Sequence, residues 1–337
     1  MSTSANKKFL VIRLSSFGDI LLTEPVVRLL GQRLGGEVTF MTKESFLPVL
    51  ELIPNIDHQV ALPPDKTAIE VLKQLGAERF DEVIDLQRNW RSAAARRKTP
   101  GHTHLARKEW WRRTAAVRFK RLHTRPHHAV ERYLTALRHH GIEPAPIAPQ
   151  LQLPDQYREW WQGGHETELL ESNYYVVGAG AAHATKRAPL ELWRELDMAI
   201  RDRYGVRPML VGAPAEREVL NKLAEGMNIS RELVIAESPI GRAAAVVADA
   251  QFVVSNDSGL AHLAAGLGRP VLSLFGPTHP VLGFTPLGNN ADYYTINEFC
   301  SPCSRHGRRP CFRDERYCFT RMRTEVILGK LERLIAG

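Results

Sequence analysis

Short apolar runs alternate with segments of helical periodicity along almost the whole chain, and this alternation constrains the fold more than any other feature. The runs are rich in Val, Ile, Leu and Phe, as strands are. Strands that are separated by helices form parallel sheets, so we expect an α/β protein with one parallel sheet in each half of the chain. The strand candidates are Phe9–Leu14, Glu37–Met41, Glu82–Leu86, Tyr174–Val177, Pro208–Val211, Phe252–Ser255 and Val271–Leu274.

The boundary between the two halves is marked by composition. A chain of 337 residues has the length of about two domains. Four prolines between residues 144 and 154 are followed by Gly163 and Gly164, a composition that suits a linker. We therefore place the boundary between residues 145 and 170.

The composition excludes several classes of protein. Hydrophobic residues make up 44% and charged residues 24% of the sequence, which is ordinary for a soluble globular chain. No apolar run approaches the ~18 residues of a membrane-spanning helix, and Arg13 interrupts the first candidate, Phe9–Ile12. The same interruption excludes a secretory signal, which needs an apolar stretch of about 7–15 residues. We expect a cytoplasmic protein.

Basic residues gather in one segment. The chain carries 45 Lys and Arg against 37 Asp and Glu, a net charge of +8. Between Arg88 and Arg125, 13 basic residues stand against one acidic residue, Glu109, so this segment carries +12 and the rest of the chain −4. Such a patch favours an anionic partner, which could be nucleic acid, acidic lipid headgroups or a phosphorylated substrate.

The first strand leads into the turn Arg13-Leu-Ser-Ser-Phe-Gly-Asp19 and then into a helix. Ligands of open α/β sheets bind at the carboxyl ends of strands, where this turn must lie. Gly18 allows a close backbone approach or a positive φ, and Asp19 is placed to act as a general base. The alternative is structural, because Ser16 and Asp19 have the spacing of a helix-capping box. The G-x-G-x-x-G spacing of a dinucleotide-binding turn is absent.

A second glycine-rich turn, Gly178-Ala-Gly180, is followed by Thr185 and Lys186. Backbone N–H groups, a hydroxyl and an ammonium together suit the oxygens of a phosphate. The alternative is that Lys186 is solvent-exposed before a helix opened by Pro189.

The most specific motif is Asn256-Asp-Ser-Gly-Leu-Ala-His262, which follows an apolar strand and opens a helix of small residues. An N-cap would also favour Asp or Ser at such a junction, but a cap explains one polar residue of the motif and not four. Ser258, Gly259 and the first free N–H groups of the helix can bind an anion. His262 lies one turn later, where a histidine is more often a packing or capping residue.

These motifs resemble, in their order, those of glycosyltransferase family 9, the bacterial ADP-heptose:lipopolysaccharide heptosyltransferases. The resemblance extends over nearly the whole chain, including the cysteine-rich tail. It is specific to the family and much less so to any one acceptor. The segments that carry it are Arg13–Asp19, the Gly178…Lys186 turn followed by Trp193, Asn256–His262, Leu274-Phe-Gly-Pro-Thr278 and His128-Ala-Val-Glu-Arg-Tyr133.

The resemblance implies a GT-B fold, in which two Rossmann-like domains face a central cleft. The expected parts are an N-terminal acceptor-binding domain at 1–160, a C-terminal nucleotide-sugar-binding domain at 161–322, and a final helix at 323–337 that packs back on the N-terminal domain. The resemblance also implies an inverting, metal-independent transferase without a cofactor. Such an enzyme moves a heptose from ADP-heptose to Kdo or heptose in the lipopolysaccharide inner core.

The resemblance also implies roles for single residues. Asp19 matches the general base of the family, and Thr185 and Lys186 match its diphosphate contacts. Glu216 falls where the family has a carboxylate on the ribose, with Glu218 as a competitor. The loop that binds the nucleotide-sugar is matched by Asp257, Ser258, Gly259 and His262. The expected acceptor-binding residues are Arg13, Ser15, Ser16, Gly18, Arg88 and Arg91.

The chemistry of sugar transfer agrees with these roles. Negative charge grows on the departing diphosphate, and without a metal it needs a helix N-terminus, hydroxyls and a cation. The second half of the chain offers all three, and the first half offers Asp19 as the base. The expected partners are the donor ADP-heptose, an anionic lipid A–core acceptor and the inner-membrane surface, and not nucleic acid.

The basic segment contains a helical pattern over Leu105–Leu122. Its apolar face comprises Trp111, Ala115, Phe119 and Leu122, with basic residues around it. Such a helix can lie on the inner face of an anionic membrane or grip the anionic groups of the acceptor. Nucleic acid is a third option, although no known recognition module is visible. The structural alternative is an ordinary helix with its apolar face in the core.

The four cysteines gather near the end of the chain, at Cys300, Cys303, Cys311 and Cys318. Clustered cysteines without a secretory signal suggest metal or redox chemistry. A structural zinc site is a weak alternative because a second Cys-x2-Cys pair is missing. Reduced, packed thiols and disulfides are the others.

Three other functions stay open at this point. The chain could be a non-catalytic nucleotide- or polyanion-binding protein of the same fold, or a transferase that uses another nucleotide-sugar. An NAD-dependent dehydrogenase is the third, and the missing third glycine counts against it.

Overall fold

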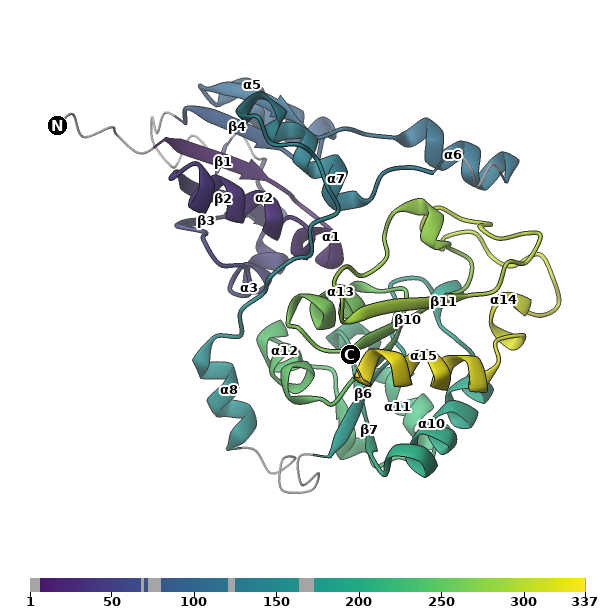
Figure 1. Ribbon diagram of the computed structural model, residues 1–337. Helices are drawn as coiled ribbons and strands as arrows, with labels where there is room; N and C mark the ends of the chain where they lie inside the picture. The colour runs from purple at the N-terminus through teal and green to yellow at the C-terminus, as the bar shows by residue number, and fades with distance from the viewer. Residues whose placement is uncertain (1–6, 68–69, 72–79, 121–124, 164–172, 337) are drawn as a thin grey trace. The chain divides into compact units, whose positions relative to one another are not determined.

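The computed structural model describes residues 7–67, 70–71, 80–120, 125–163 and 173–336. The chain divides into two compact units, Met1–Lys108 with Ala129–Gln152 and Glu109–His128 with Leu153–Gly337 (Figure 1). Each unit contains one parallel sheet, so the expected α/β class is confirmed. Within the described ranges, no helix is both long and apolar enough to cross a membrane.

The first unit is built on a five-stranded parallel sheet in the order β3-β2-β1-β4-β5. β1 lies at the centre, and its residues from Phe9 to Ile12 are fully buried, as in a strand that is covered on both faces. Residues from other elements, such as Val83 and Ala95, pack on this core. The strands are β1 (Lys8–Ile12), β2 (Glu37–Lys43), β3 (His58–Leu62), β4 (Glu82–Asp85) and β5 (His102–Leu105).

Short helices connect these strands. The helix α7 runs on directly into the 3-10 turn η3, and the two end at Gly141, which adopts a φ of 69°. Glycine is the residue best suited to this left-handed C-terminal position. The helices are α1 (Phe17–Leu21), α2 (Glu24–Arg28), η1 (Leu29–Arg33), η2 (Glu44–Phe46), α3 (Leu47–Leu50), α5 (Trp90–Lys98), α7 (Ala129–Leu134) and η3 (Thr135–His140).

The second unit is built on a six-stranded parallel sheet in the order β11-β10-β9-β6-β7-β8. The inner strands β6 and β10 are buried along their whole length. The strands are β6 (Tyr174–Gly178), β7 (Arg207–Val211), β8 (Val234–Ile235), β9 (Val253–Asn256), β10 (Val271–Phe275) and β11 (Ala291–Thr295).

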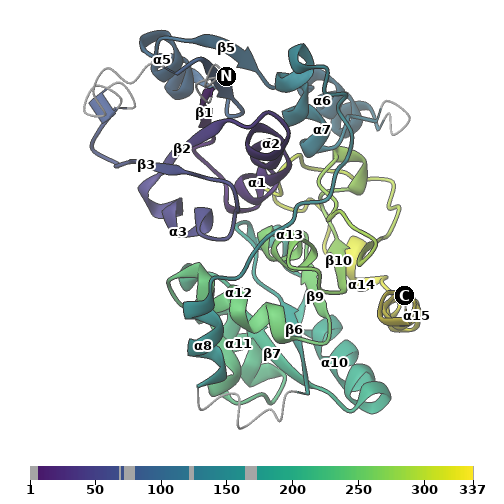
Figure 2. The ribbon, with the colours of Figure 1, turned by 60° about the vertical axis from the view of Figure 1, so that its left-hand side comes forward.

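Helices cover this second sheet. The helix α10 buries Trp193, Leu196 and Ile200 in the core, and α8 lies beside α12 (Figures 1 and 2). The main helices are α6 (Trp110–Phe119), α8 (Asp155–Gln162), α10 (Leu190–Tyr204), α11 (Arg217–Gly226), α12 (Ile240–Asp249), α13 (Gly259–Gly266), α14 (Tyr317–Thr320) and α15 (Thr324–Ala336). The short turns are η4 (Ala184–Lys186), η5 (Pro214–Glu216), η6 (Arg231–Leu233) and η7 (Pro280–Leu282).

The two units differ from the expected domains 1–160, 161–322 and 323–337. The second unit begins at Leu153 and also takes up residues 109–128. The final helix, which we expected to pack on the N-terminal domain, packs on α10, β10 and β11 of the second unit. It does so because Ile327 and Leu331 are fully buried in the core of that unit.

The basic segment also folds differently from the expectation. Leu105 ends strand β5, and the helix α6 runs only from Trp110 to Phe119; Leu122 lies outside the described residues. The aromatic residues of the expected apolar face are largely exposed, Trp111 to 58% and Phe119 to 64%. Ala116 is fully buried and packs on Val281 and Leu282 instead. Its small side chain lets the helix approach this patch closely.

Candidate active site

Asp19 lies in the first turn of α1, just after the carboxyl end of β1. Its Oδ2 accepts hydrogen bonds from the Ser16 hydroxyl at 2.7 Å and from the Ser16 backbone N–H at 3.4 Å. The expected cap is therefore present, because the carboxylate returns to the residue before the helix. The cap occupies one carboxylate oxygen and does not exclude a catalytic role for the side chain.

The other oxygen of Asp19 binds two further donors. Arg13 Nη2 lies 2.9 Å from Oδ1, and the Tyr133 hydroxyl donates to the same atom at 2.8 Å. Burial favours the neutral carboxyl group, but the Arg13 charge and the hydrogen bonds from Ser16 and Tyr133 outweigh it and lower the pKa of Asp19 to about 2. The side chain is 21% exposed. Asp19 is thus an ionised carboxylate with access to solvent.

Tyr133 ends a segment that carries the resemblance but was not predicted as a site residue. It comes from α7, more than a hundred residues beyond Asp19, and its ring also lies under the Arg13 guanidinium at 5.2 Å. Burial and the neighbouring Asp19 raise the pKa of Tyr133, so its hydroxyl stays a donor. The signal that could have found it is its place in the family-like segment from His128 to Tyr133.

The expected acceptor-binding residues near Asp19 are held by the protein itself. Arg13 is mostly buried, and its Nη1 donates to the Leu86 carbonyl at 2.8 Å. The backbone N–H of Ser15 donates to Gln87 Oε1 at 3.3 Å. Gly18 lies within α1 and has no positive φ, so of the two expected uses of this glycine only a close backbone approach stays a prediction. Together these contacts fix the turn and the direction of the Asp19 carboxylate.

Arg88 and Arg91 follow β4, the neighbour of β1 in the sheet. Arg88 adopts a φ of 53°, and its Nη1 donates to the Ala106 carbonyl at 3.0 Å. The Lys108 ammonium donates to the Arg88 carbonyl. Arg91 is exposed on α5, where its guanidinium lies 5.1 Å from the Trp90 ring. The carboxyl edge of this sheet is therefore basic at β1 and β4 alike.

In the second unit, Asn256 holds the loop that carries Thr185 and Lys186. It is the last residue of β9, and its Nδ2 donates to the Ala179 carbonyl at 2.6 Å. Its Oδ1 accepts from the Ala188 backbone N–H at 3.1 Å. One buried amide thus binds the loop at its beginning and at its end.

Lys186 forms an ion pair with Asp257. Its Nζ lies 2.8 Å from Asp257 Oδ2, which also accepts a hydrogen bond from the Thr278 hydroxyl at 2.6 Å. The three residues follow β6, β9 and β10, which are neighbours in the sheet. The structure therefore brings together two motifs that the sequence separates by about 70 residues. Thr278 was part of a quoted motif but was not expected as a site residue.

Ser258 is the N-cap of α13. Its hydroxyl accepts from the Leu260 N–H at 3.3 Å and lies 3.1 Å from the Ser255 hydroxyl. Gly259 is the first residue of the helix, and His262 is buried within it. The capping interpretation holds for Ser258, while its neighbour Asp257 is engaged with Lys186. The free N–H groups of this helix begin beside that ion pair.

Glu216 lies against two glycines at the ends of β6 and β7. A Cβ at Gly180 would collide with its carboxylate, and one at Gly212 would lie 2.9 Å from Oε2. The Ala213 backbone N–H donates to the same oxygen at 2.9 Å. The competitor Glu218 has a side chain 81% exposed and pairs with Lys222. The geometry therefore favours Glu216 as the carboxylate of this site.

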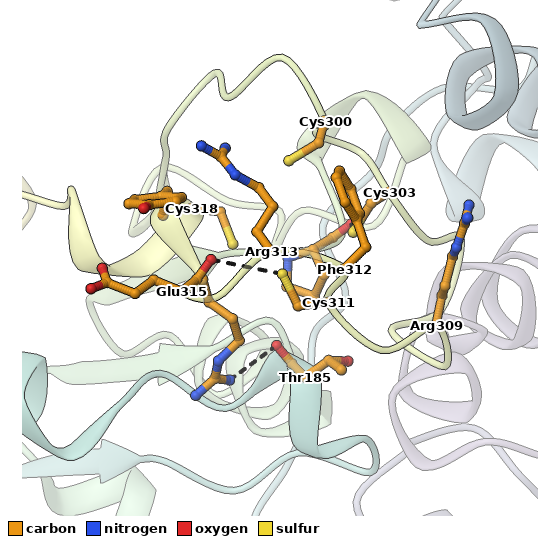
Figure 3. A pocket seen from close by; sticks show the side chains of 12 residues that line it. Thr185, Cys300, Cys303, Arg309, Cys311, Phe312, Arg313, Glu315 and Cys318 are labelled. Carbon is orange, nitrogen blue, oxygen red and sulfur yellow. Dashed lines mark hydrogen bonds between the residues drawn. The ribbon is translucent and has the colours of Figure 1, made fainter.

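The four cysteines line one pocket together with Thr185 and Pro277 (Figure 3). All four are free thiols. Burial and the neighbouring thiols raise the pKa of Cys318 to about 12. Arg316 from the same segment donates to the Ala184 carbonyl at 3.2 Å, and the Thr185 hydroxyl donates to the Gly307 carbonyl. The cysteine-rich segment therefore supports the turn with Thr185 and Lys186.

Among the described residues, a group of possible metal ligands with atoms within 4.8 Å of one another lies in the first unit and contains no cysteine. It consists of Glu82, His139 and His140.

Comparison with known proteins places these features in a family. A family model described as glycosyltransferase family 9 (heptosyltransferase) matches residues 68–310. Lipopolysaccharide heptosyltransferase 1 of Escherichia coli K12 is 29% identical over 293 residues, which cover 82% of this chain and 89% of that protein.

Solved structures agree with the family model. The chain matches E. coli ADP-heptose lps heptosyltransferase II with a TM-score of 0.74 at 21% identity over 98% of both chains. It matches E. coli heptosyltransferase WaaC with ADP-2-deoxy-2-fluoro heptose with a TM-score of 0.63 at 25% identity, over 89% of this chain and 97% of that one. These likenesses confirm the GT-B fold class. The chain belongs to glycosyltransferase family 9 and is a glycosyltransferase.

Proposed function

We propose that this enzyme transfers a heptose from ADP-heptose to Kdo or heptose in the lipopolysaccharide inner core, with inversion and without a metal. The observation that carries the proposal is the ionised carboxylate of Asp19, which three side chains hold at the carboxyl end of β1. The relative named lipopolysaccharide heptosyltransferase 1 and the structure of WaaC with an ADP-heptose analogue support the choice of donor and acceptor.

Asp19 acts as the general base in this reaction. It takes the proton of the acceptor hydroxyl as that oxygen bonds to the anomeric carbon and the bond to the diphosphate breaks. Attack from the face opposite the diphosphate inverts the anomeric centre. A carboxylate with a pKa of about 2 is a weak base, so the proton moves late, when the hydroxyl has become acidic through bonding to the oxocarbenium-like carbon.

The second unit stabilises the departing diphosphate. The Lys186 ammonium, the Thr185 and Ser258 hydroxyls and the first N–H groups of α13 all lie at the carboxyl ends of β6 and β9. Positive charge and preformed N–H donors lower the energy of a growing anion. This donor set supplies what a metal ion supplies in other transferases.

Glu216 would accept hydrogen bonds from the ribose hydroxyls. Its Oε2 is oriented by the Ala213 N–H at 2.9 Å, and Gly180 and Gly212 leave room for its carboxylate. On the acceptor side, Arg13 is paired with Asp19, whereas Arg88, Arg91 and Lys108 give the edge beyond β4 a positive charge that suits an anionic core.

The helix α6 supports attachment to the cytoplasmic face of the inner membrane. Trp110, Trp111 and Phe119 are exposed on it, next to the basic Arg112 and Arg118. Exposed aromatic rings among cations suit the interface of an anionic bilayer. Replacing Trp111 and Phe119 by Ser should reduce sedimentation with anionic vesicles and leave turnover of a water-soluble acceptor unchanged. Equal sedimentation would contradict this attachment.

The test of the function is turnover of ADP-heptose with a lipid A–core acceptor, together with calorimetric titration of ADP. Asp19→Asn should lower kcat by about 10²–10⁴-fold and leave ADP affinity unchanged. Asp65→Asn, an exposed carboxylate of the same unit, is the matched control and should have no effect. Unchanged turnover in Asp19→Asn would refute the base. Selective binding of UDP or GDP would mean that the donor is another nucleotide-sugar, and binding of no nucleotide would indicate a non-catalytic protein.

A further inference from the structure

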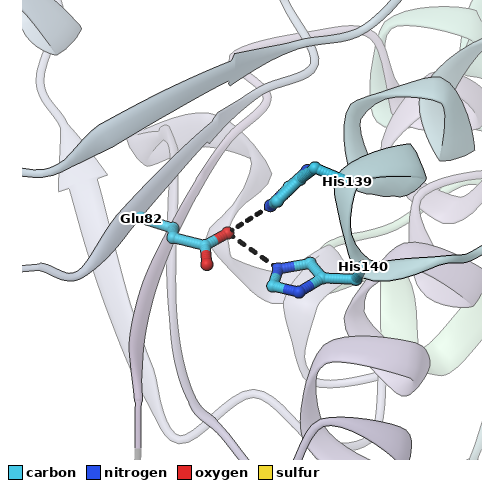
Figure 4. A group of neighbouring side chains, drawn as sticks. All are labelled: Glu82, His139 and His140. Atoms are coloured by element: carbon cyan, nitrogen blue, oxygen red, sulfur yellow. Dashed lines mark hydrogen bonds and ion pairs between the residues drawn. The ribbon is translucent and has the colours of Figure 1, made fainter.

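Three histidines surround one buried carboxylate in the first unit. Glu82 Oε2 lies 2.8 Å from His139 Nε2 and 2.9 Å from His140 Nε2 (Figure 4). His104 Nε2 lies 3.5 Å from the same oxygen. Glu82 itself is only 6% exposed. Imidazole nitrogens from two different elements thus point at a single carboxylate oxygen.

This cluster is remote from the chemistry proposed above. Glu82 is the first residue of β4, whereas Asp19 follows the carboxyl end of the neighbouring strand β1. Glu82 therefore lies at the opposite end of the parallel sheet from the edge that binds ligands. No step of the sugar transfer uses it, so the cluster needs an explanation of its own.

The distances suit a metal ion. A tetrahedral zinc site with bonds of about 2.0–2.1 Å places its ligand atoms ~3.3 Å from one another. His139 and His140 form hydrogen bonds with Glu82 Oε2 in the structure, and an ion would take the place of these bonds. The three nitrogen–oxygen distances of 2.8, 2.9 and 3.5 Å lie within about 0.5 Å of the zinc value. Small side-chain rotations would therefore complete the coordination.

The surroundings of Glu82 also resemble those of a metal ligand. Its second oxygen, Oε1, is 3.3 Å from the Lys7 ammonium. This outer contact leaves Oε2, the oxygen that faces the histidines, as the single carboxylate donor for an ion. The rings of His104 and His139 are stacked, with centroids 3.4 Å apart and planes 8° from parallel. The stacking holds the two rings side by side, so the nitrogens of both are directed to the same carboxylate oxygen.

We propose that Glu82, His139 and His140 bind a divalent transition metal ion of the zinc class, with His104 as the fourth ligand or an outer contact. Imidazole and carboxylate donors suit Zn²⁺ and its neighbours, whereas Ca²⁺ and Mg²⁺ prefer oxygen donors alone. The site joins β4 to η3, the continuation of the helix that carries Tyr133. The ion would act as a structural brace, which is compatible with metal-independent sugar transfer.

The experiment measures zinc binding and thermal unfolding of the full chain. Because the four cysteines could also bind zinc, all variants carry Cys→Ser at 300, 303, 311 and 318. We expect this parent to retain about one Zn²⁺ after dialysis and to melt at a higher temperature with Zn²⁺ than with a chelator. His139→Gln and His140→Gln should each weaken binding by more than the ~10–100-fold typical of outer-contact changes and abolish the thermal shift.

His58→Gln is the matched control. His58 Nε2 pairs with Glu37 Oε1 at 2.9 Å, a single imidazole–carboxylate pair in the same unit, and its loss should leave zinc binding unchanged. Circular dichroism of each variant without metal checks that the fold is kept. Zinc retention by His139→Gln and His140→Gln, or its absence from the parent, would overturn the proposal. Zinc bound only when the cysteines are present would assign it to the thiols.

Discussion

The contact between Tyr133 and Asp19 gives the sharpest test of the active-site geometry. Tyr133→Phe removes a hydroxyl that donates to Asp19 Oδ1 at 2.8 Å and leaves the buried ring in place. A hydrogen bond to a charged group contributes about 1.5–3 kcal/mol to stability, whereas one between neutral groups contributes about 1 kcal/mol. The substitution should therefore lower the free energy of unfolding by about 2 kcal/mol in the native chain and by about 1 kcal/mol in Asp19→Asn.

The assay is a double-mutant cycle. Urea unfolding of the native chain, both single variants and the double variant gives the coupling energy between residues 133 and 19, which we expect to be about 1 kcal/mol. Turnover should fall roughly tenfold in Tyr133→Phe, because the base loses one of the groups that orient it, while ADP affinity stays constant. Tyr204→Phe is the control, since its buried hydroxyl has no hydrogen-bond partner among the described residues. Additive effects of the two substitutions, with a coupling near zero, would refute the reasoning.

Three further predictions follow from the structure. The pKa of Asp19 is lowered from 3.8 to about 2, so its ion pair and hydrogen bonds add about 2 kcal/mol to the free energy of unfolding above pH 4, and this is lost as the pH falls through 2. The urea midpoints of the native chain and of Asp19→Asn should therefore converge on acidification. A constant gap between the two midpoints would contradict this. Lys186→Met should weaken ADP binding at least tenfold by calorimetry, because it removes the cation proposed to contact the diphosphate; unchanged affinity would exclude that role. Ala116→Asp should speed the hydrogen exchange of the α6 backbone amides, since it places a charge against Val281 and Leu282. Phe119→Asp should change these exchange rates less. A larger increase in Phe119→Asp would mean that the other face of the helix packs.

The strands that the sequence predicts are those inside the sheets. β1, β4, β6 and β10 are buried from end to end or nearly so, and burial on both faces selects the apolar runs that identify them. Of the four edge strands, β8 was missed because it has only two residues, and β3, β5 and β11 were missed because one side faces solvent. Their polar sequences, such as His102-Thr-His-Leu105, carry no such signal.

The candidate site was predictable where its residues belong to one motif. Asp19 follows a strand of the first sheet, and Lys186 and Asp257 follow strands of the second. Within each sheet the parallel arrangement brings such ends to one edge. The partners that hold them were not predictable, because Tyr133 and Thr278 reach them from distant parts of the chain. The packing face of α6 was misread for a related reason, since its small buried residue, Ala116, contacts a patch more than 160 residues away.

That distance has a consequence for synthesis on the ribosome. Phe284, the last residue to pack on the patch under α6, leaves the ribosome 165 residues after Phe119. At about 5–20 residues per second this takes roughly 8–33 s. Throughout that interval α6 has emerged without its partner, and its basic and aromatic side chains are open to other molecules. All residues of the first unit precede residue 153, so this unit can be completed while residues 109–128, which are inserted in it, still wait for the rest of the second unit.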